Sequence, residues 1–198
     1  SQQTFIRNQY PDINIYFGIS ELLNMLKNED YDLALNAISG SAGLKSSFAI
    51  AQRGKNLALA NKESLAMAGH LLMPLIKSQG SKILPVDSEH SAVFQLLEGH
   101  PHNEIRKIYI TASGGALRDI PLNELENITL ERALQHPNWS MGTKVTLDSA
   151  TMFNKALEVM EAHWLFNLDF EQIDCVLHPQ SVVHSLVEFI DGAIFAQM

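Results

Sequence analysis

Two carboxylates stand one residue apart where an apolar run in the chain ends. Asp87 and Glu89 follow the run 82–86, and a helical pattern of apolar residues comes after them. In open α/β sheets, ligands bind beyond the carboxyl ends of the strands, so chemistry is expected here. If the strand runs on through Glu89, both carboxylates point the same way, because side chains alternate with period two. Converging carboxylates repel unless a cation or a shared proton lies between them, and hard oxygen ligands favour Mg²⁺ or Mn²⁺ over zinc.

The same residues allow a second interpretation. Ser88 would cap the following helix, and the acidic residues would lie in its first turn, near the positive end of the helix dipole. Residues 82–90 alone do not decide between a metal site and an ordinary acidic helix start, so both hypotheses stay open at this point.

A helical pattern over 149–166 carries a second group of polar residues. Asn154, Lys155 and Glu158 lie opposite its apolar stripe, and a solvated polar face is the usual explanation for such a group. Two features favour a function instead. Ser149 and the free amides of the first turn would form an anion site near Lys155, and Glu158 adds a third carboxylate on the side of Asn154.

The elements that must position these residues begin with alternating strands and helices. Pro74 predicts a kink or an early break in the helix that contains it. The alternation implies right-handed crossovers and a parallel sheet, hence an α/β fold. We expect strands at 13–17, 33–38, 56–60 and directly before Asp87, with helices over 19–27, 44–53 and 62–78.

After Glu89 the pattern changes to a mixture of helices and strands. The dipeptide Asp191-Gly192 predicts a type I′ hairpin between the last two strands. We expect helices at 89–97 and 149–166, and strands at 107–111, 173–177, 182–190 and 193–197.

The segment 136–142 places His136, Trp139 and Met141 among turn residues, inside the weakly patterned stretch 117–144. Such a segment is typical of a mobile lid over a binding site. It is equally typical of a surface loop that Trp139 anchors to the core, so both interpretations stay open.

Composition excludes several classes of protein. The 198 residues are 46 % hydrophobic and carry a formal charge of −8 without a basic cluster, which argues against nucleic-acid binding. No apolar run approaches the length of a membrane span, and no signal peptide opens the chain. Cys175 is the single cysteine, so we expect no intramolecular disulfide and no thiolate metal site, and we expect the thiol in the core. Both ends of the chain look cut within a pattern.

Six motifs, taken in order, resemble the 1-deoxy-D-xylulose 5-phosphate reductoisomerase family. The resemblance covers essentially the whole chain, and six ordered motifs are far more specific than any one of them. A small departure is Ala116-Leu117, where many relatives carry Pro-Phe. The motifs are LANKES at 59–64, PVDSEH at 85–90, TASGG at 111–115, HPNWSMG at 136–142, DSATMFNKALE at 148–158 and HPQSVVHS at 178–185.

The resemblance implies a division of the chain. Residues 1–86 would be the second part of a Rossmann-like NADPH-binding domain. Residues 87–198 would be an α+β catalytic domain, incomplete at its C-terminus, whose sheet forms a homodimer. The glycine-rich phosphate loop that should open the first domain is absent, because no G-x-G-x-x-G motif follows a strand.

The resemblance also implies the roles of individual residues. Asp87, Glu89 and Glu158 would bind Mg²⁺ or Mn²⁺, with Co²⁺ possible, and would act in catalysis with Lys62 and His136. The substrate-binding positions would be Ser88, Ser113, His136, Trp139, Ser149, Asn154 and Lys155. The NADPH side would be lined by Ala37, Ile38, Ala60, Asn61, Lys62, Glu63, Met141 and Gly142.

The implied reaction rearranges the sugar phosphate 1-deoxy-D-xylulose 5-phosphate and reduces the product with NADPH to 2-C-methyl-D-erythritol 4-phosphate, in non-mevalonate isoprenoid biosynthesis. It would take place in bacterial cytoplasm or a plastid-type organelle, with no nucleic-acid or membrane partner. Two alternatives remain from the residues themselves. One is a metal-dependent sugar-phosphate isomerase or aldolase without hydride transfer, because the derived features concern only metal and phosphate. The other is a non-catalytic fragment.

Overall fold

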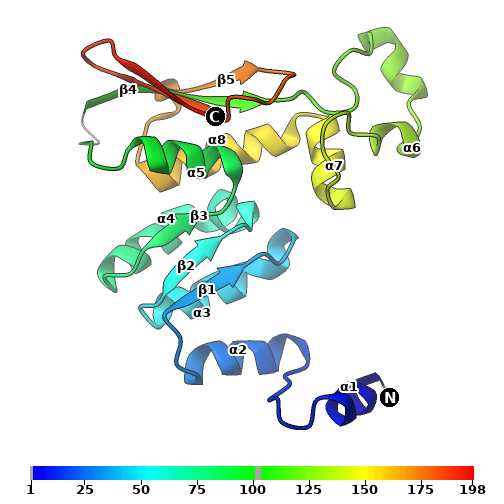
Figure 1. Ribbon diagram of the computed structural model, residues 1–198, viewed down its shortest axis with the longest axis vertical. Helices are drawn as coiled ribbons and strands as arrows, with labels where there is room; N and C mark the ends of the chain where they lie inside the picture. Colours follow the sequence, from blue (N-terminus) through cyan, green and yellow to red (C-terminus); the bar gives the residue numbers. More distant parts are fainter. Residues whose placement is uncertain (1, 101–103) are drawn as a thin grey trace.

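A three-stranded parallel sheet forms the first half of the fold. The computed structural model describes residues 2–100 and 104–198. The sheet has the order β1-β2-β3, from β1 (Leu33–Asn36), β2 (Asn56–Leu59) and β3 (Ile83–Pro85), with Leu35 beside Ala58 and Ala58 beside Leu84. The crossover helices are α3 (Leu44–Gln52) and α4 (Lys62–Ser78), and α2 (Gly18–Asn28) packs against α3 (Figure 1). The parallel sheet predicted from the alternating pattern is therefore confirmed.

The first half differs from the prediction in two places. Residues 13–17 form no strand, and the chain there leads from α1 (Gln2–Gln9) to α2. β1 is an edge strand, so Leu33 and Leu35 are exposed although the strand reads as an apolar run. The buried core lies instead around Leu57, Leu65 and Leu72 of β2 and α4.

Helix α4 is irregular, although not at the predicted position. It continues through Pro74, and its non-helical residue is Ala68 (φ −144°, ψ 24°). The neighbouring Gly69 lies against the indole of Trp164, where a Cβ atom would come within 2.3 Å of the ring. The irregular turn thus lies where another helix approaches most closely, and the prediction of a break at Pro74 is wrong.

A mixed four-stranded sheet forms the second half. Its order is β5-β4-β6-β7, with β4 and β5 parallel and the other pairs antiparallel. The core between this sheet and helices α5 and α8 includes Ile108, Ile110, Val187, Val93 and Phe166. The strands are β4 (Ile105–Ala112), β5 (Ile173–Leu177), β6 (Ser185–Phe189) and β7 (Ile194–Gln197), and the helices are α5 (Ser88–Leu96) and α8 (Phe153–Phe166) (Figure 1).

The hairpin between β6 and β7 is not the predicted type I′ turn. Type I′ requires positive φ at both central residues, whereas Gly192 (φ 87°) is the only residue of this loop in that region. The Gly192 N–H donates to the Phe189 carbonyl, and the Phe189 N–H donates to the carbonyl of Ala193. This is a three-residue loop with glycine at the left-handed position.

The sheet leaves apolar side chains uncovered on its edge strands. Val176 and Leu177 of β5 and Ile194 and Phe195 of β7 are exposed. Cys175 of β5 is exposed too, so its expected place in the core is wrong.

The helix predicted over 149–166 is two helices. α7 (Thr143–Ala150) has Thr151 as its C-cap, and α8 begins after Met152. The φ of Met152, 61°, interrupts the helical conformation between them. Before them, the chain runs through a 3-10 helix (Leu122–Asn127) and the short α6 (Leu130–Ala133), which lie at one end of the second sheet (Figure 1).

Helices α4 and α8 pack against each other and join the two halves. Between the halves, β3 leads directly into α5. In the described part of the chain, no helix is both long and apolar enough to cross a membrane.

Candidate active site

Three carboxylates from two different helices meet at one cavity and line it. β3 ends at Pro85, and Asp87 is the N-cap of α5, where it accepts a hydrogen bond from the Glu89 N–H at 3.4 Å. The strand therefore does not run on through Glu89, and the helix start is the correct local geometry, with Asp87 rather than Ser88 as its cap. Nevertheless one oxygen of each of Asp87, Glu89 and Glu158 lies within 4.8 Å of the others.

Two lysines neutralise this cluster. The Lys62 ammonium, at the start of α4, donates to Asp87 and to Glu158 Oε1, the latter at 2.9 Å. Lys155 Nζ pairs with Glu158 and lies 3.8 Å from Glu89 Oε1. Four of these five side chains come from helix starts or from the first turns of helices, which explains how residues distant in sequence meet.

The charges shift one another's protonation. Burial acts to raise the pKa of Asp87, but the nearby Lys62 and His90 and the hydrogen bonds from Lys62 and Glu89 together outweigh it and hold that pKa well below its usual range. Burial raises the pKa of Glu89 to about 7, together with the nearby Asp87 and Glu158 carboxylates. Burial also acts to lower the pKa of Lys62, yet Asp87 and Glu158 raise it above its usual value. Nearby opposite charges therefore set the direction of the pKa shift at Asp87 and Lys62 against the effect of burial. At Glu89, nearby like charges and burial both raise the pKa.

The donor set fits a hard divalent cation. Three carboxylates supply only oxygen atoms, as Mg²⁺ and Mn²⁺ prefer. They line a cavity of about 350 Å³, and Lys62 and Lys155 line the same cavity. A small-molecule site with a few convergent charged groups is typical of an active site.

Every residue expected to bind substrate lines this cavity, although Ser149 is not where it was expected. Ser149 lies in the last turn of α7, where its Oγ donates to the Val145 carbonyl, so no anion site at a helix N-terminus exists there. The Gly114-Gly115 turn packs onto this end of α7, because a Cβ at Gly115 would lie 2.2 Å from the Ser149 carbonyl oxygen. The substrate-binding candidates around the cavity are Ser88, Ser113, His136, Trp139, Ser149, Asn154 and Lys155.

The segment 136–142 covers one side of the cavity. The backbone N–H groups of Asn138 and Trp139 donate to His136 Nδ1. The proton therefore resides on Nε2, which lies 3.3 Å from Ser113 Oγ. Burial and the nearby Arg118 lower the pKa of His136, which favours this neutral ring. Trp139 is 50 % exposed, so it does not anchor the loop in the core.

The residues expected to bind the cofactor are not all brought to this cavity. Of that set, only Lys62 and Met141 are among its lining residues. Asn61 is instead buried as the N-cap of α4, where it accepts from the Ser64 N–H and donates to the carbonyls of Ile38 and Gly40. Glu63 pairs with Lys144 at 2.6 Å and ties α4 to α7. Ala37, Ile38, Ala60 and Gly142 complete that set outside the lining of this cavity.

Some lining residues had no assigned role in the sequence. Ser181, with φ of 52°, and His184 come from the loop that precedes β6. Both residues belong to the motif at 178–185, so the resemblance indicated this loop but implied no role for its residues. Asn138 Nδ2 donates to the Pro179 carbonyl at 2.7 Å and holds segment 136–142 against this loop.

The parallel sheet and the mixed sheet, with their helices, define a Rossmann-like α/β class of protein. Two family models match the chain: 1-deoxy-D-xylulose 5-phosphate reductoisomerase over residues 2–69, and the C-terminal domain of the same enzyme over residues 83–166. The chain belongs to the 1-deoxy-D-xylulose 5-phosphate reductoisomerase family.

Individual relatives agree with this assignment. The reductoisomerase of Agathobacter rectalis is 53 % identical over 187 residues, which are 94 % of this chain and 49 % of the relative. That of Geobacillus sp. is 50 % identical over 194 residues, 98 % of this chain and 51 % of the relative. The chain thus spans about half the length of these curated relatives.

Solved structures are similar throughout the chain. A crystal structure of DOX-P reductoisomerase in complex with NADPH, fosmidomycin and magnesium has a TM-score of 0.92 and 43 % identity, and it covers 100 % of this chain and 51 % of the other. The Zymomonas mobilis enzyme in complex with NADPH has a TM-score of 0.82 and 46 % identity, over 90 % of this chain and 46 % of the other.

Proposed function

We propose that the protein containing this chain converts 1-deoxy-D-xylulose 5-phosphate to 2-C-methyl-D-erythritol 4-phosphate, using NADPH and a divalent metal ion, in isoprenoid biosynthesis. The observation that carries the proposal is the meeting of Asp87, Glu89 and Glu158 with Lys62 and Lys155 below one cavity. The names of the relatives and the ligands of the solved reductoisomerases support the same activity.

Asp87, Glu89 and Glu158 would hold the metal ion, which would be Mg²⁺, Mn²⁺ or Co²⁺. When bound, the ion would supply Lewis-acid stabilisation of charge on substrate oxygens. The ammonium of Lys62 bonds two of these carboxylates. When a bound cation neutralises these two carboxylates, the Lys62 ammonium would be available to donate to a substrate hydroxyl.

The part of the cavity around Lys155 would hold the phosphate group. Lys155 supplies a positive charge, and His136 Nε2–H and the Ser113 hydroxyl supply hydrogen-bond donors. The Ser149 hydroxyl donates to the Val145 carbonyl and would have to turn to reach the phosphate group. Charge-assisted hydrogen bonds of this kind are the strong ones. Asn154, which donates to Glu158, and Ser88, which donates to Glu89, also line the cavity and would orient the sugar hydroxyls.

NADPH would approach from the α4 side of the cavity, past Lys62 and Met141, with Ala37, Ile38, Ala60, Asn61, Glu63 and Gly142 toward the nucleotide. The fit to this group is partial, because the sequence contains no glycine-rich loop to hold the pyrophosphate. Trp139 and Met141 would close over the reacting carbons and exclude water. Hydride transfer is chemistry that the cofactor supplies when bound.

Residues 1–86 and 87–198 would be the two domains, and the second sheet would form a homodimer. The exposed apolar side chains of β5 and β7 support that interface, because large exposed apolar patches mark association sites. The cytoplasm of a bacterium, or a plastid-type organelle, is the proposed location.

The test is NADPH oxidation by the full-length protein. With 1-deoxy-D-xylulose 5-phosphate and Mg²⁺, absorbance at the NADPH band should fall, and chelation of the metal should stop the reaction. Rearrangement of the substrate without consumption of NADPH would instead support a metal-dependent isomerase or aldolase. Absence of both reactions in a folded protein would contradict the proposal.

A further inference from the structure

Behind the carboxylates lies a buried histidine that contacts both helices of the proposed metal site. His90 belongs to α5, one residue after Glu89, and its side chain is fully buried. Its Nε2 lies 2.8 Å from the backbone carbonyl oxygen of Glu158 on α8. One imidazole therefore links the helix start that carries Asp87 and Glu89 with the turn that carries Glu158.

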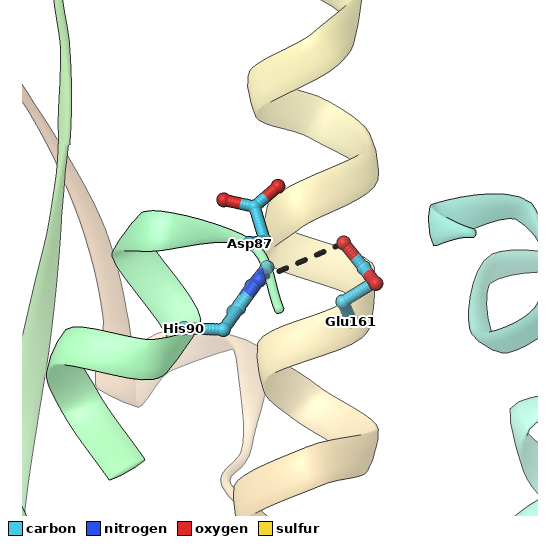
Figure 2. A group of neighbouring side chains, drawn as sticks. All are labelled: Asp87, His90 and Glu161. Atoms are coloured by element: carbon cyan, nitrogen blue, oxygen red, sulfur yellow. Dashed lines mark ion pairs between the residues drawn. The ribbon is translucent and has the colours of Figure 1, made fainter. Parts of the chain in front are cut away.

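The other nitrogen of this ring faces a second buried acid. Nδ1 of His90 lies 3.6 Å from Glu161 Oε2, and Figure 2 shows the two side chains pointing toward each other from α5 and α8 with Asp87 beside them. At 3.6 Å the contact is not a hydrogen bond. Neither atom has another hydrogen-bond partner among the described residues.

The backbone carbonyl of Glu158 fixes the orientation of the His90 ring. A carbonyl oxygen only accepts, so Nε2 of His90 carries a hydrogen and donates to Glu158. The other ring nitrogen, Nδ1, then faces the Glu161 carboxyl group across 3.6 Å.

A second cation explains the cluster less well. Asp87, His90 and Glu161 offer ligand atoms within 4.8 Å of one another, as a metal site would. However, neither His90 nor Glu161 lines the cavity that opens onto the three carboxylates, and both are buried.

We propose that His90 and Glu161 are a positioning pair that fixes the Glu158 turn of α8 relative to the start of α5. The inference rests on the proposed metal site, whose ligands these two helices carry. Buried polar atoms without a hydrogen bond lower the stability of a fold rather than raise it, so the contact of His90 with Glu161 is not explained by stability, whereas partners behind metal ligands set the ligands' orientation.

The first test compares two substitutions of Glu161 in the full-length protein, with the Mn²⁺ dissociation constant measured by electron paramagnetic resonance. Glu161→Gln keeps the volume and offers an amide N–H to His90 Nδ1, so the constant should stay within about threefold of the parent. Glu161→Leu removes that donor and should weaken Mn²⁺ binding by about 10-fold or more. Its melting temperature should not fall, because a buried carboxyl is replaced by an apolar group.

The second test removes the link to Glu158. His90→Leu should weaken Mn²⁺ binding by about 10–100-fold, and His90→Gln, which keeps a donor near the Nε2 position, should recover most of it. His163→Gln is the matched control, because His163 Nδ1 contacts the Leu168 carbonyl at the other end of α8. It should lower the melting temperature and leave Mn²⁺ binding unchanged.

Three outcomes would overturn the inference. Parent-like Mn²⁺ affinity in folded Glu161→Leu would remove the positioning role while leaving the metal site intact. Two Mn²⁺ ions per chain, one of them lost in Glu161→Gln, would assign the pair to a cation. Parent-like affinity in Glu158→Gln would remove the metal site itself, and the inference with it.

Discussion

The ammonium of Lys62 lies between the carboxylates of Asp87 and Glu158 and donates to both. Lys62 comes from α4 in the first half of the fold and Glu158 from α8 in the second. In the absence of a metal ion this lysine supplies the positive charge that the buried acids require.

Lys62→Met should therefore destabilise the metal-free protein. Breaking a buried ion pair leaves uncompensated charge and costs about 3–5 kcal/mol. Mn²⁺ should restore more stability in this variant than in the parent, because the ion replaces the lost charge. Thermal unfolding with and without Mn²⁺ measures both effects. Lys144→Met is the control, since Lys144 is partly exposed and pairs with Glu63 and Asp148 away from the cluster. Equal shifts in the two variants would contradict the prediction.

Glu158→Gln should weaken Mn²⁺ binding at least about 10-fold, since it removes a carboxylate from the three that neutralise the ion. Isothermal titration of the full-length protein gives the constant. Glu171→Gln, in the 3-10 helix Phe170–Gln172, is a control outside the site. If the Glu158 variant binds Mn²⁺ as the parent does, Glu158 is not the third ligand.

Lys155→Ala should raise the Michaelis constant for the phosphorylated substrate by about 10–100-fold, because a charge-assisted hydrogen bond contributes about 1.5–3 kcal/mol. Steady-state kinetics at saturating Mg²⁺ separates this effect from weaker metal binding through Glu158. A change confined to the NADPH constant would show that the phosphate binds elsewhere.

Gly115→Ala should destabilise the fold by about 2 kcal/mol or more. Positive φ costs a side chain about 1–2 kcal/mol, and the new Cβ would meet the Ser149 carbonyl. Gly80→Ala is a matched control, with φ of +67° against +66° and no atom within 4 Å. Urea unfolding of both variants isolates the cost of the close approach. Equal losses would mean that the turn does not press on α7.

The 198-residue chain by itself should show weak metal and phosphate binding and no measurable NADPH turnover. Its sequence lacks the loop that would hold the pyrophosphate, and the β1 edge exposes Leu33 and Leu35. It should also self-associate through β5, β7 and this edge. Light scattering and an NADPH assay check both points. A monodisperse monomer with the turnover of the full-length protein would refute this prediction.

The sequence predicted the parallel sheet well, because alternating apolar runs and helical patterns are local signals. It predicted the meeting of Asp87 and Glu89 for the wrong reason. The strand stops at Pro85, and the two acids meet at a helix start rather than on one face of a strand.

Other features could not be predicted from local sequence patterns. The break between α7 and α8 depends on Met152 in a left-handed conformation, which sequence rarely indicates for a residue other than glycine. It moved Ser149 from an expected helix start to a helix end. The pair of His90 and Glu161 joins separate helices, so no periodicity in either segment predicts it.

The contact of Trp164 with Gly69 has a consequence for cooperativity. It presses α8 onto α4, and these two helices also carry Glu158 and Lys62. A ligand that binds across both helices stabilises only the docked arrangement, by mass action. Docking of the halves and occupancy of the site are therefore thermodynamically linked, and the chain should lose both in one transition rather than unfold half by half.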